Sequence, residues 1–418
     1  MFKIHHIKSI RISIQPLLVG VLLIVGFSLK AQSLEELKTI SAENNLDLKA
    51  QYKSFKAQLE NVMQAKSWQD PNLSFGYFIS PIETRVGPQI AKFSLTQMLP
   101  WFGTFKARGD VAAYRAEAEY EKFQNQKLKL FLEVAKHYYE LAFLSEKVHL
   151  EDEQIQLLAD VKLMVESHYE NDKAKMTDIL RIELEIDELK TSVQVLEDQK
   201  KALVSQLNQL MNRPTETPIV IDNPRQILEN TNDLKMQKIA ENHPRLEKIQ
   251  RKQEANEAEK ELAKKQAMPQ FGFGLDYAII QNRNVRATDA GQDAIIPTIS
   301  ISLPIFGKKN RSRKKQAQLK GESLQFQLEN EKTRLETEIE VAQYKKEELL
   351  SVLDLYNKQL ESLKDILQLA EVALANDSMD IEEVLRLEEE RLLYQKQKAE
   401  TLADLQKNKE TLDYLTLK

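Results

Sequence analysis

Apolar and polar side chains alternate at two places in the chain. The apolar positions of the first place are Leu73, Phe75, Tyr77, Ile79, Ala91, Phe93 and Leu95. Those of the second are Phe271, Phe273, Leu275, Tyr277, Ile279, Ile299, Ile301 and Leu303. Residues between them are mainly Ser, Thr, Gly, Lys or Asp. A period of two places successive side chains on opposite faces of a strand, so the pattern predicts two β-hairpins, over residues 71–99 and 269–304. A break over residues 81–88 and a polar loop over 281–293 would join their strands.

Apolar residues at steps of three and four predict helices over most of the remaining chain. Residues 104–171 and 308–374 contain no proline and predict two helices of about 100 Å each. Shorter helical patterns cover residues 33–66, 176–212 and 381–418, and the second of these carries an apolar heptad with Lys200 in its seam. Two short helices placed end to end would match one long helix, so we expect a wall of paired antiparallel helices.

The period changes from two to about 3.6 at two similar stops. Pro100 and Gly103 form the first, Pro304 and Gly307 the second, and the two prolines are 204 residues apart. Proline ends a strand ladder and glycine permits a bend, so both stops predict strand-to-helix junctions. Similar spacing elsewhere predicts two tandem repeats, over residues 33–225 and 226–418, with tunnel helices over 104–212 and 308–418. Residues 213–225 form a proline-rich connector with one short strand expected at 218–221.

Composition and charge narrow the class of protein. The chain has 418 residues, 29% of them charged, and no cysteine, which excludes disulfides and thiolate metal sites. Residues 1–32 combine a basic start with a short apolar run and predict a signal peptide, with a membrane anchor as the alternative. Without its four basic residues the net charge changes from −5 to −9, which argues against a nucleic-acid partner.

The predicted strands have one apolar, aromatic face and one polar face. That pattern is typical of a membrane barrel, and the alternative is a small antiparallel sheet packed on helices. A signal peptide and very long helices favour the barrel. Four strands cannot close a barrel, and open edges are not tolerated in lipid, so several chains would have to share one barrel.

The order of these motifs resembles the TolC family of outer-membrane channel proteins. The resemblance is carried by the junctions at residues 99–106 and 303–307 and by the helix turns at 169–180 and 374–385. Asp172 stands where the family usually has glycine in the first turn. The resemblance implies an α+β membrane protein, a homotrimer with a 12-stranded outer-membrane β-barrel that continues into a periplasmic α-helical coiled-coil tunnel.

The same resemblance implies function and partners. Family members are passive exit ducts of tripartite efflux pumps or of type I secretion, in contact with outer-membrane lipid. They work with a periplasmic adaptor protein and an inner-membrane pump. Metal ions, drugs and secreted proteins all remain open as substrates. Two alternatives are a periplasmic adaptor and a coiled-coil scaffold without a channel.

Candidate site residues concern gating rather than chemistry. No catalytic constellation, metal-ligand spacing or cofactor motif is present, so we expect no enzyme activity and no cofactor. The acidic residues at the two helix turns would form a ring at a periplasmic gate, or would simply cap helices. The resemblance favours Asp178 and Glu383, and Arg386, one turn after Glu383, suggests an acid–arginine latch. The candidate gate residues are Asp178, Glu383, Arg386, Asp377 and Asp380.

Aromatic and basic residues next to the junctions suggest a membrane boundary. Trp101, Phe102 and Phe306 suit an aromatic belt at the level of the lipid head groups. A basic run over residues 308–315 follows the second junction. It would contact anionic head groups or form a solvated helix face.

Overall fold

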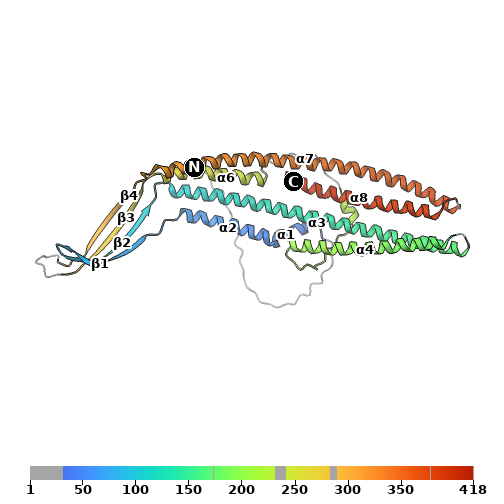
Figure 1. Ribbon diagram of the computed structural model, residues 1–418, viewed down its shortest axis with the longest axis horizontal. Coiled ribbons are helices and arrows are strands. Elements are labelled where there is room, and N and C mark those ends of the chain that lie inside the picture. The colour runs from blue at the N-terminus through green and yellow to red at the C-terminus, as the bar shows by residue number, and fades with distance from the viewer. Residues whose placement is uncertain (1–31, 173, 231–241, 283–289, 377, 418) are drawn as a thin grey trace.

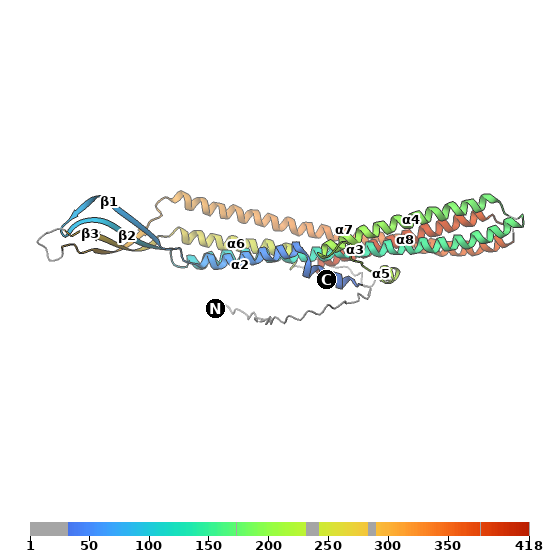
Figure 2. The same cartoon turned by 90° about the horizontal axis from the view of Figure 1, so that it is seen from below.

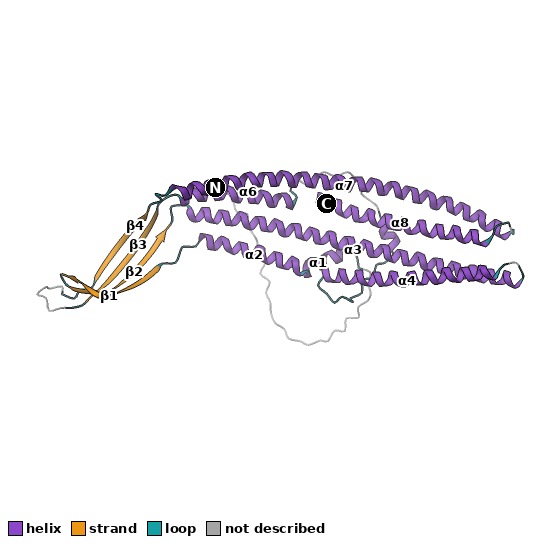
Figure 3. Ribbon diagram, in the orientation of Figure 1, coloured by secondary structure: helices purple, strands orange, loops and turns teal. Residues whose placement is uncertain are grey.

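The computed structural model describes residues 32–172, 174–230, 242–282, 290–376 and 378–417. These residues form an elongated body with a β-sheet at one end and helices over the rest of its length (Figures 1 and 3). The predicted signal peptide lies outside the described residues except for Gln32. None of the described helices has an apolar stretch sufficient to cross a membrane.

The same order of elements occurs twice. The elements of the first repeat are α1 (Leu34–Asn44), α2 (Leu46–Lys66), β1 (Asn72–Thr84), β2 (Gly87–Leu99), α3 (Thr104–Glu170) and α4 (Met176–Leu210). Those that follow are α5 (Pro224–Glu229), α6 (Pro244–Gln266), β3 (Gln270–Ile280), β4 (Ala294–Ser302), α7 (Gly307–Ala375) and α8 (Ile381–Thr416). Each repeat therefore places a hairpin between a short helix and a very long one, as the sequence predicts.

The described strands form one antiparallel sheet in the order β1-β2-β3-β4. The pairing of β2 with β3 joins the two hairpins, and Phe93 lies opposite both Phe75 and Tyr277. The row next to it carries Ser74, Ser94 and Asp276, and Lys92 forms an ion pair of 2.7 Å with Asp276. Apolar and polar rows thus alternate over most of the sheet and give it one mainly apolar and one mainly polar face.

The apolar face of the sheet is open to its surroundings. The side chains of Phe75, Tyr77, Ile295 and Ile299 are 61%, 68%, 65% and 74% exposed. β1 and β4 are edge strands, each with one strand partner in the described chain. A long edge next to an exposed apolar face would aggregate in water unless other chains or lipid covered it.

The long helices α3 and α7 form the backbone of the helical part. They have 67 and 69 residues and are about 100 Å long. The shorter helices pack along them in succession, α2 and then α4 on α3, α6 and then α8 on α7. α3 also packs on α6 and α8 and so joins the two repeats. The turns between α3 and α4 and between α7 and α8 lie together at the end opposite the sheet (Figures 1 and 2). We call these two turns the tips.

Two apolar clusters hold these helices together. One surrounds Val134 and Tyr138 of α3 near the middle of the body and includes Leu37 of α1. The other lies toward the tips, where Ile182 of α4, Leu367 of α7 and Val384 of α8 meet. The predicted heptad of α4 supplies buried residues to both clusters, because its apolar seam faces the other helices along most of its length.

The first helical pattern, over residues 33–66, is two helices rather than one. Asn45 has an extended backbone (φ −56°, ψ 126°), and its side chain accepts a hydrogen bond of 2.9 Å from the Leu48 amide. Its own side-chain amide donates to the Leu210 carbonyl, again at 2.9 Å. The asparagine therefore ends α1 and caps α2, because its short polar side chain competes with the helical backbone for hydrogen bonds. His243 precedes α6 in the same way, and its Nδ1 accepts from the Arg245 amide.

Two further predictions about local structure were wrong. The break expected over residues 81–88 is a tight turn, because β1 continues through Pro81 to Thr84 and β2 begins at Gly87. β1 is an edge strand with a shift of register between Tyr77 and Ile82, and proline is tolerated in such a place. The strand expected at residues 218–221 is absent from the described connector, where Ile219 and Ile221 pack on the central cluster instead.

Candidate functional site

The first junction, between β2 and α3, turns within four residues. Pro100 follows the last residue of β2, and Gly103 precedes α3 with a left-handed backbone (φ 79°, ψ 0°). The Thr104 amide and hydroxyl donate to the Trp101 carbonyl at 3.1 and 2.6 Å, which satisfies one carbonyl inside the turn. The indole of Trp101 stacks on Phe271 of β3 with ring centres 5.8 Å apart. The turn is therefore anchored to the end of the sheet.

The second junction, between β4 and α7, reaches the same end of the sheet by a different route. Its backbone turns at Pro304, where the Ile305 amide donates to the Leu303 carbonyl at 2.9 Å. Phe306 precedes α7 with an extended backbone, and Gly307 is the first helical residue. Gly307 has no left-handed backbone, and a side chain placed there would meet no atom within 4 Å. The expectation that both glycines permit the bend is therefore correct for the conformation of Gly103 and wrong for Gly307.

The predicted boundary aromatics are exposed to different degrees. Phe102 and Phe306 are 79% and 83% exposed, as is Ile305 at 75%. Trp101 is half-buried against Phe271 and contacts Phe102 edge-on at 5.9 Å between ring centres. Exposed aromatic side chains therefore lie where the sheet meets the helices.

The first tip, between α3 and α4, is built by its acidic residues. Asp172 has a left-handed backbone with φ 57°, the conformation in which glycine is favoured and aspartate is tolerated. Asp178 accepts hydrogen bonds from the Lys175 amide at 3.0 Å and from the Thr177 hydroxyl at 3.3 Å. The carboxylate of Asp178 thus caps its own helix, which matches the capping alternative considered for this cluster.

The second tip, between α7 and α8, leaves its predicted gate residues more open. Asp380 precedes α8, yet its side chain makes no capping hydrogen bond. Glu383 and Arg386 lie 3.8 Å apart on one helix face, with both side chains more than half exposed. Asp377 lies outside the described residues. The structure therefore brings Glu383 and Arg386 together, while Asp178 turns back to its own backbone.

An ion pair that sequence reasoning missed connects the two tips. Arg181 of α4 binds the Glu382 carboxylate of α8, and this contact raises the pKa of Arg181. The signal for it was present, because Arg181 is the repeat counterpart of Arg386 at a spacing of 205 residues. Arg181 thus bridges two helices. Arg386, within the described residues, pairs with Glu383 of its own helix.

A cluster of glutamates lies one heptad further from the tips. Glu185 of α4 is half-buried and faces Glu388 and Glu389 of α8, with Glu188 on its own helix. Burial, followed by repulsion from Glu389, Glu188 and Glu388, raises the pKa of Glu185 to about 7. Burial also raises the pKa of Glu388, although Arg391 lies 2.6 Å from its carboxylate. Like charges therefore face each other between α4 and α8 just behind the attractive Arg181–Glu382 pair.

Comparison with known proteins identifies the family of this chain. The family model for outer membrane efflux proteins matches residues 39–213 and 236–416, which is most of the chain. The chain belongs to the outer membrane efflux protein family. No curated protein matches it by sequence.

Solved structures of the same fold agree with the family assignment. The outer membrane protein VceC from Vibrio cholerae superimposes with a TM-score of 0.70 at 15% identity, over 92% of this chain and 95% of that chain. CusC gives a TM-score of 0.71 at 15% identity, over 92% and 91% of the two chains. The outer membrane channel MtrE of Neisseria gonorrhoeae, described in an open state, gives 0.67 at 14% identity, over 92% and 88%.

Family membership settles the class of function. This outer membrane efflux protein is an outer-membrane channel with a large periplasmic helical part, and the expectation of an α+β tunnel fold is confirmed. The family is one of transport proteins that generally act as trimers together with an adaptor and an inner-membrane pump. A periplasmic adaptor or a scaffold without a channel is therefore excluded.

The two junction glycines of this efflux protein should respond differently to substitution. Gly103→Val should lower the stability of the assembled channel by about 1–2 kcal/mol or more, because a β-branched residue is strained at positive φ. Gly307→Ala should leave stability unchanged or raise it by up to about 1 kcal/mol, since alanine is the better helix former. The temperature at which the oligomer dissociates on gels measures both effects. Equal losses in the two variants would contradict the assignment of the bend to Gly103.

Proposed function

We propose that three copies of this chain form one passive exit duct, each giving four strands to a shared 12-stranded barrel. The observation that carries this proposal is the sheet, with its two open edges β1 and β4 and its exposed apolar face. Closure is the way to satisfy edge strands in lipid, and a ring of three sheets would pair β4 of each copy with β1 of the next. The polar rows with Lys92, Ser94 and Asp276 would then line the lumen.

The helices support the same arrangement. Large apolar side chains stand exposed along α7, a helix whose partners in the described chain are α6 and α8. They include Val341 at 62%, Tyr344 at 70%, Leu369 at 71% and Val372 at 59% exposure. A neighbouring copy would cover this stripe and continue the helical wall into a tunnel. The tips, at the far end from the barrel, are then the place where an adaptor and a pump dock.

The tips would act as the gate of this duct. Within one chain, Arg181 of α4 binds Glu382 of α8. In a closed ring α8 of one copy meets α4 of the next, and the repeat then places Arg386 near Asp178 of the neighbouring copy. An Arg386–Asp178 latch of this kind, with Glu383 and Asp380 beside it, would hold the tips together by charge. Asp377 belongs to the same turn and is proposed with them.

Channel measurements test the duct and the gate together. The mature protein should run as a heat-modifiable trimer on gels and should form pores in planar bilayers. Arg386→Ala and Glu383→Ala should each raise the single-channel conductance, because each removes one charge of the proposed latch. Asp198→Ala is a matched control, since its carboxylate pairs with Lys201 of the same helix far from the tips. A soluble monomer without pores would overturn the duct, and unchanged conductance in both gate variants would overturn the latch.

A further inference from the structure

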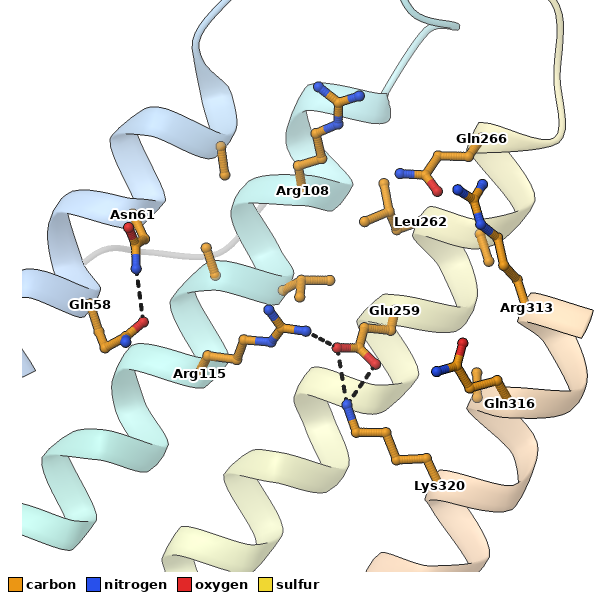
Figure 4. Close-up of a pocket in the computed structure, with 15 residues that line it drawn as sticks. Gln58, Asn61, Arg108, Arg115, Glu259, Leu262, Gln266, Arg313, Gln316 and Lys320 are labelled. Carbon is orange, nitrogen blue, oxygen red and sulfur yellow. Dashed lines mark hydrogen bonds and ion pairs between the residues drawn. The ribbon is translucent and has the colours of Figure 1, made fainter. Parts of the chain in front are cut away.

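A hollow of about 550 Å³ lies on the helical wall near the sheet, lined by residues of α2, α3, α6 and α7 (Figure 4). Its charged groups, together with the Gln266 amide, lie in two layers. The lower layer, further from the sheet, consists of Arg115, Glu259 and Lys320. The upper layer consists of Arg108, Gln266 and Arg313. Both layers take one residue each from α3, α6 and α7.

The two layers are the same pattern repeated one heptad apart. Each residue of the upper layer is seven positions from its lower counterpart on the same helix. Seven residues make about two helical turns, which returns a side chain to the same face. The layers differ chemically at α6, where the upper layer has Gln266 and the lower has Glu259.

The lower layer shows what this pattern does when an anion occupies its centre. The Glu259 carboxylate binds Arg115 on one side and Lys320, at 2.9 Å, on the other. Burial raises the pKa of Glu259, but the bonds from Lys320 and Arg115 outweigh that and hold the pKa below its usual range. One carboxylate is therefore stabilised between a cation of α3 and a cation of α7.

The upper layer has the two cations without the anion. Figure 4 shows the Gln266 amide between Arg108 and Arg313. An amide oxygen accepts a hydrogen bond but neutralises no charge. Within the described ranges neither arginine has a carboxylate partner, and Arg108 lies 5.9 Å from the centre of the Phe105 ring. Both are half-buried, and each guanidinium group presents N–H donors in a fork that suits the oxygens of a phosphate or carboxylate.

In the proposed trimeric duct we place the hollow on the inner face of the wall. Side chains from four successive helices converge on it, and side chains on a curved wall converge on its concave side and diverge on its convex side. In a closed tunnel the concave side is the lumen. This step rests on the proposed trimeric duct.

We infer that Arg108, Gln266 and Arg313 form a binding site for a small oxyanion group, a phosphate or carboxylate carried by a solute in the lumen. Three copies would place six arginines around the passage just below the barrel. Such a ring concentrates anionic solutes at the point where they leave the tunnel. The neutral side chain at position 266 keeps the ring open to an exogenous anion.

Block of single-channel current by inorganic phosphate is the direct test. Phosphate should reduce the current of the wild-type trimer at constant ionic strength. Arg108→Gln, Arg313→Gln and Gln266→Glu should each raise the half-blocking phosphate concentration by about tenfold or more. Gln266→Glu is the sharpest variant, because it copies the lower layer and supplies a built-in carboxylate at nearly constant volume. Lys106→Gln and Lys314→Gln remove nearby cations outside the hollow and should leave the block unchanged.

The outcomes separate this site from the duct itself. Pores that conduct but show equal phosphate block in wild type and all three site variants would overturn the site and leave the duct intact. A chain that forms no pores would overturn the duct. Bilayers of phosphatidylcholine and of phosphatidylglycerol distinguish the source of the anion. Equal block in both supports a solute of the lumen, whereas loss of block in phosphatidylglycerol would overturn the lumenal site in favour of a lipid head group.

Discussion

Arg245→Met should lower the free energy of unfolding by about 3–5 kcal/mol. This is the largest loss we expect from substitution of a single buried residue in the helical wall. Arg245 lies in the first turn of α6, and its side chain is 7% exposed. Its guanidinium donates to Glu331 at 2.5 Å and to both oxygens of Glu338 at 2.6 and 3.0 Å, which joins α6 to α7. Methionine keeps most of the stem and removes the charge, so the two carboxylates would retain only Arg334, whose side chain is 59% exposed.

The same contacts give this network a defined pH dependence. The bond from Arg245 lowers the pKa of Glu338 more than burial raises it. A carboxyl with a lowered pKa in the folded state adds stability above its unfolded pKa of about 4.5, and that stability is lost as the pH falls through the folded value. The gap between wild type and Arg245→Met should therefore narrow under acid conditions.

A neighbouring arginine provides the control for this prediction. Arg251 lies on the same helix and pairs with three glutamates, but its side chain is 33% exposed. Arg251→Met should lower stability by less than about 1 kcal/mol, because exposed pairs are weakened by solvent. The dissociation temperature of the proposed trimer in detergent and the urea midpoint of helix loss measure both variants. Equal effects at the two positions would show that burial of Arg245 contributes nothing.

The alternating rows were predictable because their physical cause is local. A strand with one face in lipid and one in water must alternate, and Phe75, Phe93 and Tyr277 carry that requirement in the sequence itself. The long helices follow for a similar reason, since 67 and 69 residues without an internal proline contain nothing that ends a helix.

The features that the sequence did not predict depend on contacts between distant segments. Asn45 ends a helix because its side chain also reaches Leu210, 165 positions away. The Arg181–Glu382 pair and the two layers around Gln266 form through the packing of separate helices, which no local period reveals. Gly307 shows a second limit of reasoning from the sequence. The two junctions have similar motifs, yet their backbones turn in different ways.

Glu185→Gln should remove most of a pH response that we expect in the channel current between about pH 6 and about pH 8. Glu185 has a pKa of about 7, raised first by burial and then by Glu389, Glu188 and Glu388. Below that pH its carboxyl is neutral and is not repelled by the acidic residues of α8. Above it, a new negative charge faces Glu388 and Glu389 across the two helices and opposes the attraction of the Arg181–Glu382 pair.

The sign of the effect follows from linkage. The folded state holds a proton on Glu185 up to about pH 7, whereas an unfolded glutamate releases it near about 4.5. Stability therefore falls as the pH rises through this window. After discounting for solvent screening, Glu185→Gln should stabilise the protein by about 1–2 kcal/mol at about pH 8 and by little at about pH 4.

The cations near this cluster decide how far the tips respond. Arg391 is engaged with Glu388 at 2.6 Å, and Glu371 of α7 adds a further negative charge beside it. Ionisation of Glu185 is thus left with repulsive neighbours, and separation of α4 from α8 is the relaxation open to the tips. Single-channel conductance should rise with pH in the wild type and stay nearly constant in Glu185→Gln. Glu183→Gln is the matched control, because its carboxylate binds Lys162 of α3 at 2.7 Å on another face of α4. An identical pH profile in wild type and Glu185→Gln would show that repulsion between α4 and α8 does not move the gate.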